Sequence, residues 1–379
     1  MKTFITGATG IVGCEIVREF LRHDGGGSIV VLMRGTPAEI DLKRRWLLQW
    51  ADVAEVEEDR LEVVCGDMTA PGLGLSSTDR DRLASVTGIL HAAAVTRFDQ
   101  SAGDALRNNV TSTSNVIDVA RSCPRVDRIG IISTAHVAGR RCGTIREDDL
   151  DFDAGFNNEY ERSKALAERE ARAAMADLPI SIFRLSIVLG RRSDGAVSRL
   201  TGLYPILRLF HDGLLAMFPG DPDQVLDLIP SDFAAQAIRH LFERRFTPRA
   251  TYHVCAGVDR SFTLRELFPS AAGCIARVDS RWGRRGQPLP LAVDPDVFRS
   301  FIEIVELTGN PRLKEIIRQT QTVTRLLDAP KVFDTRHFAR ALGDCGPSLA
   351  HVREWLQPII TRAIQTNWQH PVRSIQNHV

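Results

Sequence analysis

Several marks of secreted, membrane-spanning and nucleic-acid-binding proteins are missing from this chain. Its seven cysteines are scattered, with no CxxC pair and no Cys/His cluster at zinc-ligand spacing, which predicts reduced thiols and no metal site. No apolar run reaches the roughly 18 residues of a membrane span, and the first residues lead into a strand rather than a signal peptide. The net charge of +1 supplies no broad positive surface for nucleic acid. These absences favour a cytoplasmic protein, and 379 residues are enough for a large core.

Three glycines, each three residues after the last, follow the first apolar run in the stretch TGATGIVG. Phe4 and Ile5 are typical of the end of a buried strand, and apolar residues from Ile11 to Phe20 recur at helical spacing. In such a strand, turn and helix start, a dinucleotide pyrophosphate rests on the amides of the helix N-terminus. A glycine turn without a ligand is the alternative, since tight turns use the same residues. The residues that would contact the cofactor here are Thr6, Gly7, Thr9, Gly10, Ile11, Val12 and Gly13.

Strand-like and helical patterns alternate through the first two thirds of the chain. Strands are predicted near 28–34, 61–68, 88–94, 128–139 and 180–190, and helices near 37–50, 105–120 and 160–176. This alternation predicts an α/β fold, a Rossmann-type doubly wound parallel sheet, with a smaller and mostly helical C-terminal lobe. We expect a cofactor-binding core over 1–190, substrate-binding segments interleaved with the last strands over 191–280, and a mostly helical region over 281–379.

Two features of the later sequence bear on the substrate. The segment 200–220 is apolar but interrupted by charges and glycines, which suits either ordinary amphipathic helices or the wall of an apolar substrate pocket. Arginines could meet the phosphates of coenzyme A or an acidic carrier protein, although scattered solvated arginines explain them equally well. These arginines are Arg140, Arg141, Arg191, Arg192 and those of WGRRG at 282–286.

Residues at the ends of three predicted strands suit a dinucleotide. Arg34 ends the second strand, where an acidic residue would bind the ribose 2′-hydroxyl, and arginine instead suits a 2′-phosphate. NADP(H) is therefore favoured over NAD(H), with a solvated arginine as the alternative. Asp67 and Met68 end the third strand, where the adenine ring would lie. The fourth ends in His91, Ala92 and Ala93, whose small residues let the backbone approach the cofactor.

The most specific pattern is YERSK, which places Tyr160 and Lys164 four residues apart on one helical face. A nearby ammonium lowers the pKa of a phenol and favours its use in acid–base chemistry, and the same lysine could hold the nicotinamide ribose. Thr134 supplies the hydroxyl that would orient a carbonyl, since strand alternation points Ser133 the other way. Asn109 would be a polar support that bonds backbone near the lysine. A surface Tyr/Lys pair is the alternative.

Together these motifs resemble the extended short-chain dehydrogenase/reductases over roughly residues 1–260. HAAAVTRFD, STAHVAG, RLSIVLG and PGDPDQVLDLIPSDFAAQAI are similar to segments of fatty acyl-CoA reductases and of reductase domains that release thioester-bound products, the male-sterility-type subfamily. The resemblance implies NADPH-dependent reduction of an acyl-CoA or carrier-bound thioester to an aldehyde, with a further step to an alcohol left open. Thr134, Tyr160, Lys164 and Asn109 would be its catalytic set.

Other members of that superfamily are the alternatives. A hydroxysteroid-like dehydrogenase would use identical machinery, whereas nucleotide-sugar epimerases and dehydratases often carry an acidic residue where Arg34 stands. A non-catalytic NADP-binding regulator typically loses the Tyr/Lys pair that this chain keeps. Peripheral membrane contact through 200–218 is compatible with each reading, and the oligomeric state is not predicted.

Overall fold

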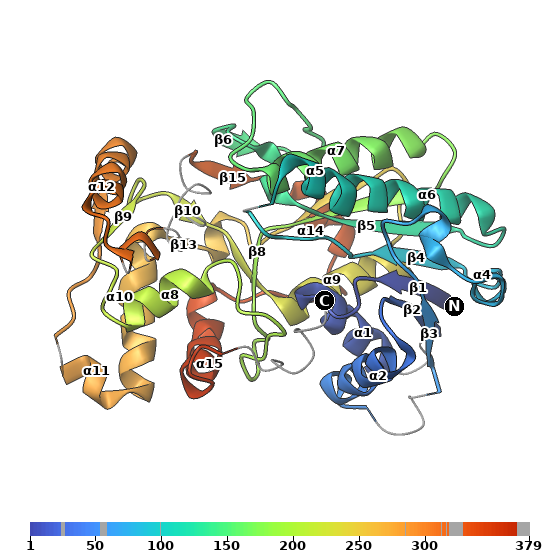
Figure 1. Ribbon diagram of the computed structural model, residues 1–379, viewed down its shortest axis with the longest axis horizontal. Coiled ribbons are helices and arrows are strands. Elements are labelled where there is room, and N and C mark those ends of the chain that lie inside the picture. The colour runs from blue at the N-terminus through green and yellow to red at the C-terminus, as the bar shows by residue number, and fades with distance from the viewer. Residues whose placement is uncertain are drawn as a thin grey trace.

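A sheet of seven parallel strands forms the centre of the protein, as a computed structural model shows it (Figure 1). The structure describes residues 1–379 except 24–26, 54–58, 99, 285, 312, 316, 318–328 and 370–379. The strand order is β12-β7-β5-β4-β1-β2-β3, so the chain winds outward in both directions from β1. The strands are β1 (Lys2–Thr6), β2 (Ser28–Met33), β3 (Leu61–Cys65), β4 (Gly88–His91), β5 (Arg128–Thr134), β7 (Ile180–Leu185) and β12 (Thr251–Val254). The predicted doubly wound fold is confirmed.

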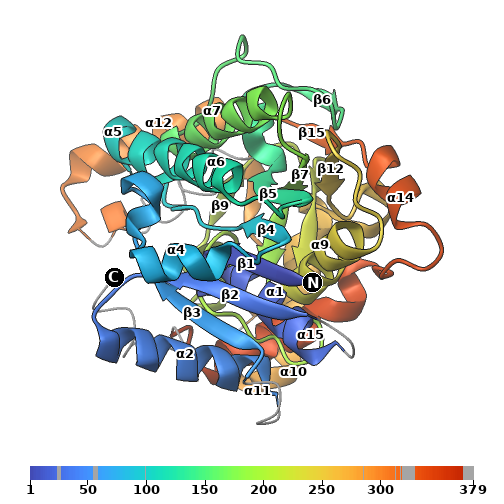
Figure 2. The ribbon, with the colours of Figure 1, turned by 90° about the vertical axis from the view of Figure 1, so that its right-hand side faces the viewer.

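Helices cover both faces of this sheet, which is why its strands are nearly continuous apolar runs (Figure 2). One face carries α1 (Ile11–Arg22), α2 (Pro37–Ala51) and α9 (Ser231–Glu243). The other carries α4 (Ser77–Leu83), α6 (Ser112–Ser122) and α7 (Glu159–Ala174). The helix expected over 105–120 is interrupted, because α5 (Ala102–Ala105) leads into a π-helical turn η2 (Leu106–Thr111) before α6. Such turns are frequent at functional sites.

A smaller and mostly helical lobe lies at one end of the molecule (Figure 1). Its helices are α8 (Tyr204–His211), α10 (Leu264–Val278), α11 (Ser280–Arg284), α12 (Pro295–Thr308) and α15 (Val352–Gln365), while α14 (Arg336–Leu342) packs on β12 and α9. Short strand pairs accompany the main sheet: β6 (Gly143–Ile145) with β15 (Lys331–Phe333), β8 (Ile187–Leu189) with β11 (Leu228–Pro230), β9 (Met217–Pro219) with β14 (Leu291–Val293), and β10 (Val225–Leu226) with β13 (Phe262–Thr263). Three short 3₁₀ helices are also present: η1 (Pro71–Gly74), η3 (Ala135–Ala138) and η4 (Val258–Arg260).

The apolar segment 200–220 belongs to the core. Tyr204, Leu207 and Phe210 of α8 are buried, and Phe210 packs against Phe268 and Trp282. The Tyr204 hydroxyl accepts a hydrogen bond from the Gly190 amide at 2.9 Å. The α8 part of this segment therefore packs as an ordinary amphipathic helix, and a role of the segment as the wall of a substrate pocket stays a prediction.

Candidate active site

Gly7 and Gly13 allow the turn between β1 and α1 to pack closely against the neighbouring backbone. Gly7 has φ +72°, and a Cβ there would lie 2.5 Å from the Ala93 amide nitrogen. A Cβ on Gly13 would lie 2.0 Å from the Gly7 carbonyl oxygen, whereas one on Gly10 would lie 3.2 Å from it. Gly10 is the N-cap of α1 and supplies no capping side chain, so the first amides of α1 face outward without a side-chain acceptor. The turn thus keeps the backbone close-packed and presents amides suited to a pyrophosphate.

We expect Gly13→Ala to damage this turn, because its Cβ would overlap backbone that cannot move aside. The expected loss of unfolding free energy is about 1–3 kcal/mol, the usual cost of overpacking. Thermal and denaturant unfolding would measure it. Gly273→Ala in α10, where a Cβ meets nothing within 4 Å, is the control and is expected to be neutral or stabilising. Equal stability of the two variants would contradict this account of the turn.

Thr6 and His91 lie deeper than the other residues expected at the cofactor. Both are fully buried, with the Thr6 hydroxyl 2.8 Å from His91 Nδ1 and the Thr113 hydroxyl 3.1 Å from His91 Nε2. Burial lowers the pKa of His91 to about 3, so the ring is neutral. The Thr6 and His91 side chains therefore bind each other and not a ligand. Only the backbone of these two residues is available to contact a cofactor. Ala92 and Ala93 continue from His91 against Gly7.

Arg34 and Asp67, expected to bind different parts of the cofactor, face each other across the ends of β2 and β3. Arg34 Nη1 lies 3.6 Å from Asp67 Oδ2, and the Arg34 side chain is 61% exposed. Hydrogen bonds from Thr69 hold the pKa of Asp67 below its usual range, with Arg34 adding to the effect. The Met68 carbonyl accepts a hydrogen bond from Asn115 at 2.9 Å. Arg34 is thus an accessible cation at the edge of the site, with a carboxylate beside it.

Thr134, at the carboxyl end of β5, lies near the Tyr160 phenol. The Thr134 hydroxyl donates to the Leu185 carbonyl at 3.3 Å and accepts from the His136 amide at 3.2 Å, so its position is well determined. Ser133 points the other way and donates to Glu168 at 3.0 Å. Burial raises the pKa of Tyr160 to about 12, and the nearby Thr134 hydroxyl opposes the rise. This direction is opposite to the lowering that the spacing of Tyr160 and Lys164 predicts, and it favours the protonated phenol.

Lys164 lies one turn after Tyr160 and is buried. Its Nζ donates to the Ile132 carbonyl at 2.7 Å, which directs the ammonium toward β5. Burial lowers the pKa of Lys164 to about 8, and the charge of Glu168 works against that shift. Lys164 therefore stays mostly charged at neutral pH. Its ammonium lies near the carboxyl end of β5.

Asn109 connects the loop after β4 to the helix that carries Tyr160. Its Oδ1 accepts from the Val95 amide at 2.9 Å, and its Nδ2 donates to the Val95 carbonyl at 3.2 Å and to the Ser163 hydroxyl at 2.9 Å. The bond expected to backbone near Lys164 is instead made to the Ser163 side chain, directly and inside the protein. Asn109 sits in the π-helical turn η2, which packs against α7.

Two residues that support the site were missed from the sequence. Ser163 receives the bond from Asn109, and Glu168 forms a fully buried ion pair with Arg184 at 2.6 Å while also accepting from Ser133. Burial works to raise the pKa of Glu168, but the charges of Arg184 and Arg172 hold it below its usual range. Glu168 follows Lys164 by four residues and so shares its helical face, a spacing that could have identified it.

A Rossmann sheet with a glycine turn and a Thr134–Tyr160–Lys164 group at its carboxyl edge defines an extended short-chain dehydrogenase/reductase. A sequence model of the male sterility protein family, a family of NAD-binding domains, matches residues 5–238, and the chain belongs to that family. It is 27% identical over 271 residues to the fatty acyl-CoA reductase wat of Drosophila melanogaster, covering 62% of this chain and 52% of that protein. It is 29% identical over 323 residues to an isonitrile lipopeptide synthase of Mycobacterium tuberculosis, and the match covers 74% of this chain and 13% of that protein.

The same fold occurs in the terminal R domain from the myxalamid PKS-NRPS biosynthetic pathway. The two structures superpose with a TM-score of 0.78 at 23% sequence identity, over 97% of this chain and 91% of that one. The chain spans about half the length of the fly reductase and a smaller part of the synthase.

Proposed function

We propose that this protein is an NADPH-dependent reductase of acyl thioesters. The observation that carries the proposal is the placement of Thr134 and Tyr160 near each other beside buried Lys164, at the sheet edge that the glycine turn also reaches. The residues fit a nicotinamide dinucleotide, because Gly7 and Gly13 leave the backbone uncovered and the first amides of α1 have no side-chain cap. Kinship with a fatty acyl-CoA reductase and with a lipopeptide synthase supports a thioester substrate.

The proposed chemistry assigns a task to each residue of the site. The bound nicotinamide would supply the hydride. Thr134 and Tyr160 would hydrogen-bond the thioester oxygen as negative charge develops on it, and Tyr160 would then give up its proton to that oxygen. The raised pKa of Tyr160 suits this direction, because the phenol is present in its acid form at neutral pH. Lys164 would stabilise the resulting phenolate and hold the nicotinamide ribose, with Asn109 fixing α7 through Ser163. Collapse of the hemithioacetal would release a thiol and an aldehyde, and a second reduction would give an alcohol.

The proposal is tested by following oxidation of NADPH with a panel of acyl-CoA thioesters, while carbonyl products are trapped and identified. Thioester-dependent oxidation that yields an aldehyde or an alcohol is the expected result, and the product distinguishes a two-electron from a four-electron reduction. Turnover of free ketones or secondary alcohols without any thioester reduction would instead assign the protein to the hydroxysteroid-like dehydrogenases. Conversion of nucleotide sugars would assign it to the epimerases.

Preference for NADPH over NADH is the finer part of the cofactor proposal, and it depends on Arg34. We expect Arg34→Ala to raise the Kd for NADPH about tenfold to a hundredfold, the value of a charged hydrogen bond, and to leave the Kd for NADH unchanged. Fluorescence titration of both nucleotides would measure this. Arg45→Ala is the control, since Arg45 is similarly exposed but pairs with Asp41 on α2. Parallel weakening of both nucleotides by Arg34→Ala would contradict a 2′-phosphate contact.

An acyl-CoA or a carrier-bound acyl group is the proposed partner, but most of the arginines expected to recognise it are engaged elsewhere. Arg141 pairs with Asp149, Arg191 with Glu15, and Arg192 with Asp232. Arg140 and Arg284 are exposed, and Arg285 lies outside the described residues. Of these arginines, Arg140 and Arg284 are therefore the exposed ones that could contact a phosphate or an acidic carrier protein.

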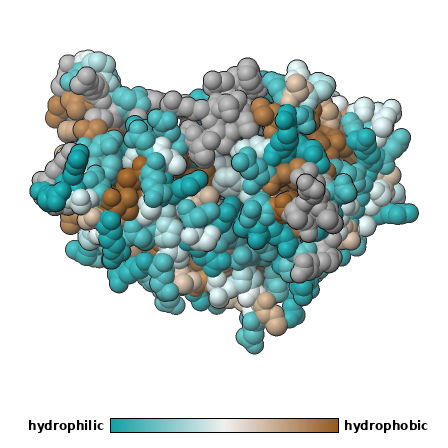
Figure 3. Space-filling model, turned by 90° about the horizontal axis from the view of Figure 1, so that it is seen from below, coloured by the Kyte–Doolittle hydropathy of each residue, from teal (hydrophilic) through white to brown (hydrophobic). Residues whose placement is uncertain are grey.

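Where the protein resides is also a proposal. In the part of the chain that the structure describes, no helix is both long enough and apolar enough to cross a bilayer. The face seen in Figure 3 is mostly hydrophilic, with hydrophobic side chains in small patches. Exposed apolar side chains include Leu307 of α12 and Leu291 of β14, at 87% and 69% exposure. We propose a cytoplasmic location, which is supported by the free thiols of all seven cysteines. We also propose that the protein can contact a membrane surface peripherally.

A further inference from the structure

The strand β15 belongs to the C-terminal part of the chain, yet it packs against the turn that follows the catalytic strand β5. It pairs with β6 (Figure 1), and its Phe333 is buried together with Ala135 and Ala138 of that turn. The Phe333 ring also meets the His136 ring edge to face at 5.7 Å. The His136 amide donates to the Thr134 hydroxyl at 3.2 Å, so β15 supports the residues that position Thr134.

A second connection leads from β15 to His253 of β12. His253 Nδ1 lies 2.8 Å from the carbonyl oxygen of Asp334, the residue after β15, and its Nε2 lies 3.2 Å from Arg184 Nη1. A carbonyl oxygen only accepts and a guanidinium only donates, so Nδ1 carries the proton and Nε2 is the acceptor. Burial, with the charge of Arg184, lowers the pKa of His253 to about 3, which agrees with a neutral ring.

Arg184 connects His253 to both elements that carry catalytic residues. Its Nε donates to Glu168 Oε2 at 3.0 Å, and its Nη2 donates to Glu168 Oε1 at 2.6 Å. Glu168 lies on α7 one turn after Lys164, and it accepts from the Ser133 hydroxyl of β5. The His253, Arg184, Glu168 and Ser133 side chains are all buried. Because the guanidinium is planar and rigid, its acceptor at Nη1 determines how the other two donors meet the carboxylate.

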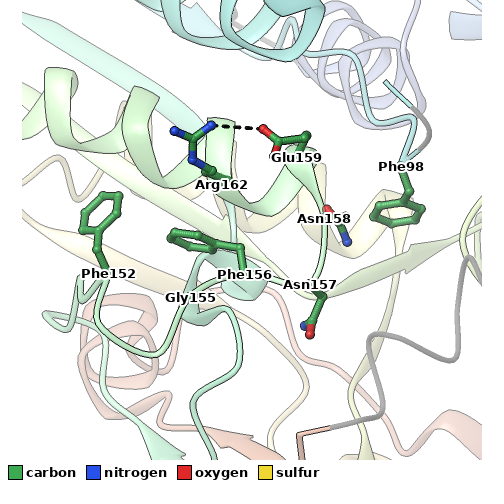
Figure 4. Close-up of a pocket in the computed structure, with 8 residues that line it drawn as sticks. All are labelled: Phe98, Phe152, Gly155, Phe156, Asn157, Asn158, Glu159 and Arg162. Atoms are coloured by element: carbon green, nitrogen blue, oxygen red, sulfur yellow. Dashed lines mark hydrogen bonds and ion pairs between the residues drawn. The ribbon is translucent and has the colours of Figure 1, made fainter. Parts of the chain in front are cut away.

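The outer side of α7 offers no comparable connection to β5 near its start. Figure 4 shows Glu159 and Arg162 paired with each other, at 3.1 Å, in the first turn of the helix. A pair within one helix does not fix that helix against another element. The placement of α7 against β5 therefore depends on its buried face, where Ser163 accepts from Asn109 and Glu168 accepts from Arg184.

We propose that His253 is a positioning residue of the active site: β15 orients its ring, and its Nε2 orients the Arg184 guanidinium on Glu168. The inference rests on the proposed function, in which groups from β5 and α7 must reach one carbonyl together. His253 touches neither substrate nor cofactor in this proposal. It keeps α7 and β5 at a fixed separation, so the C-terminal segment 331–334 contributes to catalysis without entering the site.

Two substitutions separate the two hydrogen bonds of the ring. His253→Asn keeps a donor for the Asp334 carbonyl but has no acceptor that reaches Arg184, whereas His253→Gln brings an acceptor to Arg184 but loses the donor. His240→Asn is the matched control. His240 is also buried and also binds a carbonyl of the C-terminal region, that of Leu342 at 3.2 Å, and within the described part of the chain it has no bond to Arg184.

The test measures kcat and KM for acyl-CoA reduction and the Kd for NADPH, each at a temperature well below the unfolding midpoint of the variant. We expect His253→Asn to lower kcat about tenfold or more, the value of a hydrogen bond to a charged group, with KM for the thioester nearly unchanged. The Kd for NADPH should rise about threefold to tenfold, because Lys164 is carried by α7. His253→Gln should recover most of both losses, and His240→Asn should lower the unfolding midpoint while leaving kcat and Kd unchanged.

A merely structural anchor would give the opposite order, with His253→Gln the more impaired variant because it loses the bond to β15. That order, or equal kcat and Kd in His253→Asn and His253→Gln, would overturn the inference. If His253→Asn does not fold, Phe333→Leu decides, since the Phe333 ring meets the His253 ring edge to face at 5.6 Å. Phe333→Leu is expected to lower kcat about twofold to tenfold, the value of an aromatic pair, and an unchanged kcat would contradict the proposal.

The proposed function and this inference fail in different ways. If the parent protein reduces no thioester, the proposed function is refuted, and the Kd values for NADPH then decide the inference alone. A Kd that rises in His253→Asn and is restored in His253→Gln upholds the positioning role, and equal Kd values overturn it.

Discussion

Replacement of Tyr160 by phenylalanine is expected to reduce kcat for thioester reduction by about a hundredfold to ten-thousandfold, the usual contribution of a general acid. The substitution removes the phenolic oxygen, which lies near Thr134 and whose proposed task is to give its proton to the product oxygen. Stopped-flow measurement of NADPH oxidation under single-turnover conditions would isolate the chemical step from product release.

The fold and the cofactor site should survive this change, because phenylalanine fills the same volume against Phe98. Affinity for NADPH in the absence of substrate is therefore the internal control and is expected to match that of the parent protein. A Tyr160→Phe variant that reduces thioesters at close to the parental rate would show that another group supplies the proton.

Replacement of Glu168 by glutamine is expected to lower the free energy of unfolding by about 3–5 kcal/mol, because it leaves the Arg184 guanidinium buried without its counter-charge. Both side chains of this pair are fully buried, with the closest oxygen and nitrogen 2.6 Å apart. The pKa of Glu168 lies below its usual value, so this stabilisation is present at neutral pH and is lost as the pH falls through the folded-state pKa. Chemical denaturation at neutral pH would measure the loss.

The control for this prediction is an ion pair of similar composition on the surface. Asp177 pairs with Arg121 at 2.8 Å, but both side chains are about half exposed, so Asp177→Asn should change stability little. If Glu168→Gln proved as mild as Asp177→Asn, the buried pair would not be a stabilising element. Glu168 also holds Ser133, which precedes Thr134 in β5, so partial loss of activity is expected alongside the loss of stability.

The elements nearest the cofactor site were predictable because short-range patterns encode them. The strand at 28–33 is a run of apolar residues, as burial on both faces of a parallel sheet requires, and α2 begins at Pro37 after a capping box of Thr36 and Glu39. The opposite directions of the Ser133 and Thr134 side chains likewise follow from the alternation of side chains along a strand. The roles assigned to these residues stay predictions until they are measured.

The sequence did not reveal contacts between residues that are distant along the chain. Adjacent strand ends bring the Arg34 and Asp67 side chains within 3.6 Å of each other, and their assignments to the ribose phosphate and the adenine stay predictions. The pKa of Tyr160 was expected to fall because Lys164 is near in sequence, whereas burial, which sequence does not report, raises it.

The sequence by itself determined the class of this protein, because strand and helix periods, the glycine turn and the Tyr160–Lys164 spacing are local properties of the chain. The tertiary structure alone decided which charges are paired and which polar groups are buried. Those outcomes depend on contacts such as Glu168 with Arg184 and β6 with β15, which form only when distant segments pack together and exclude water.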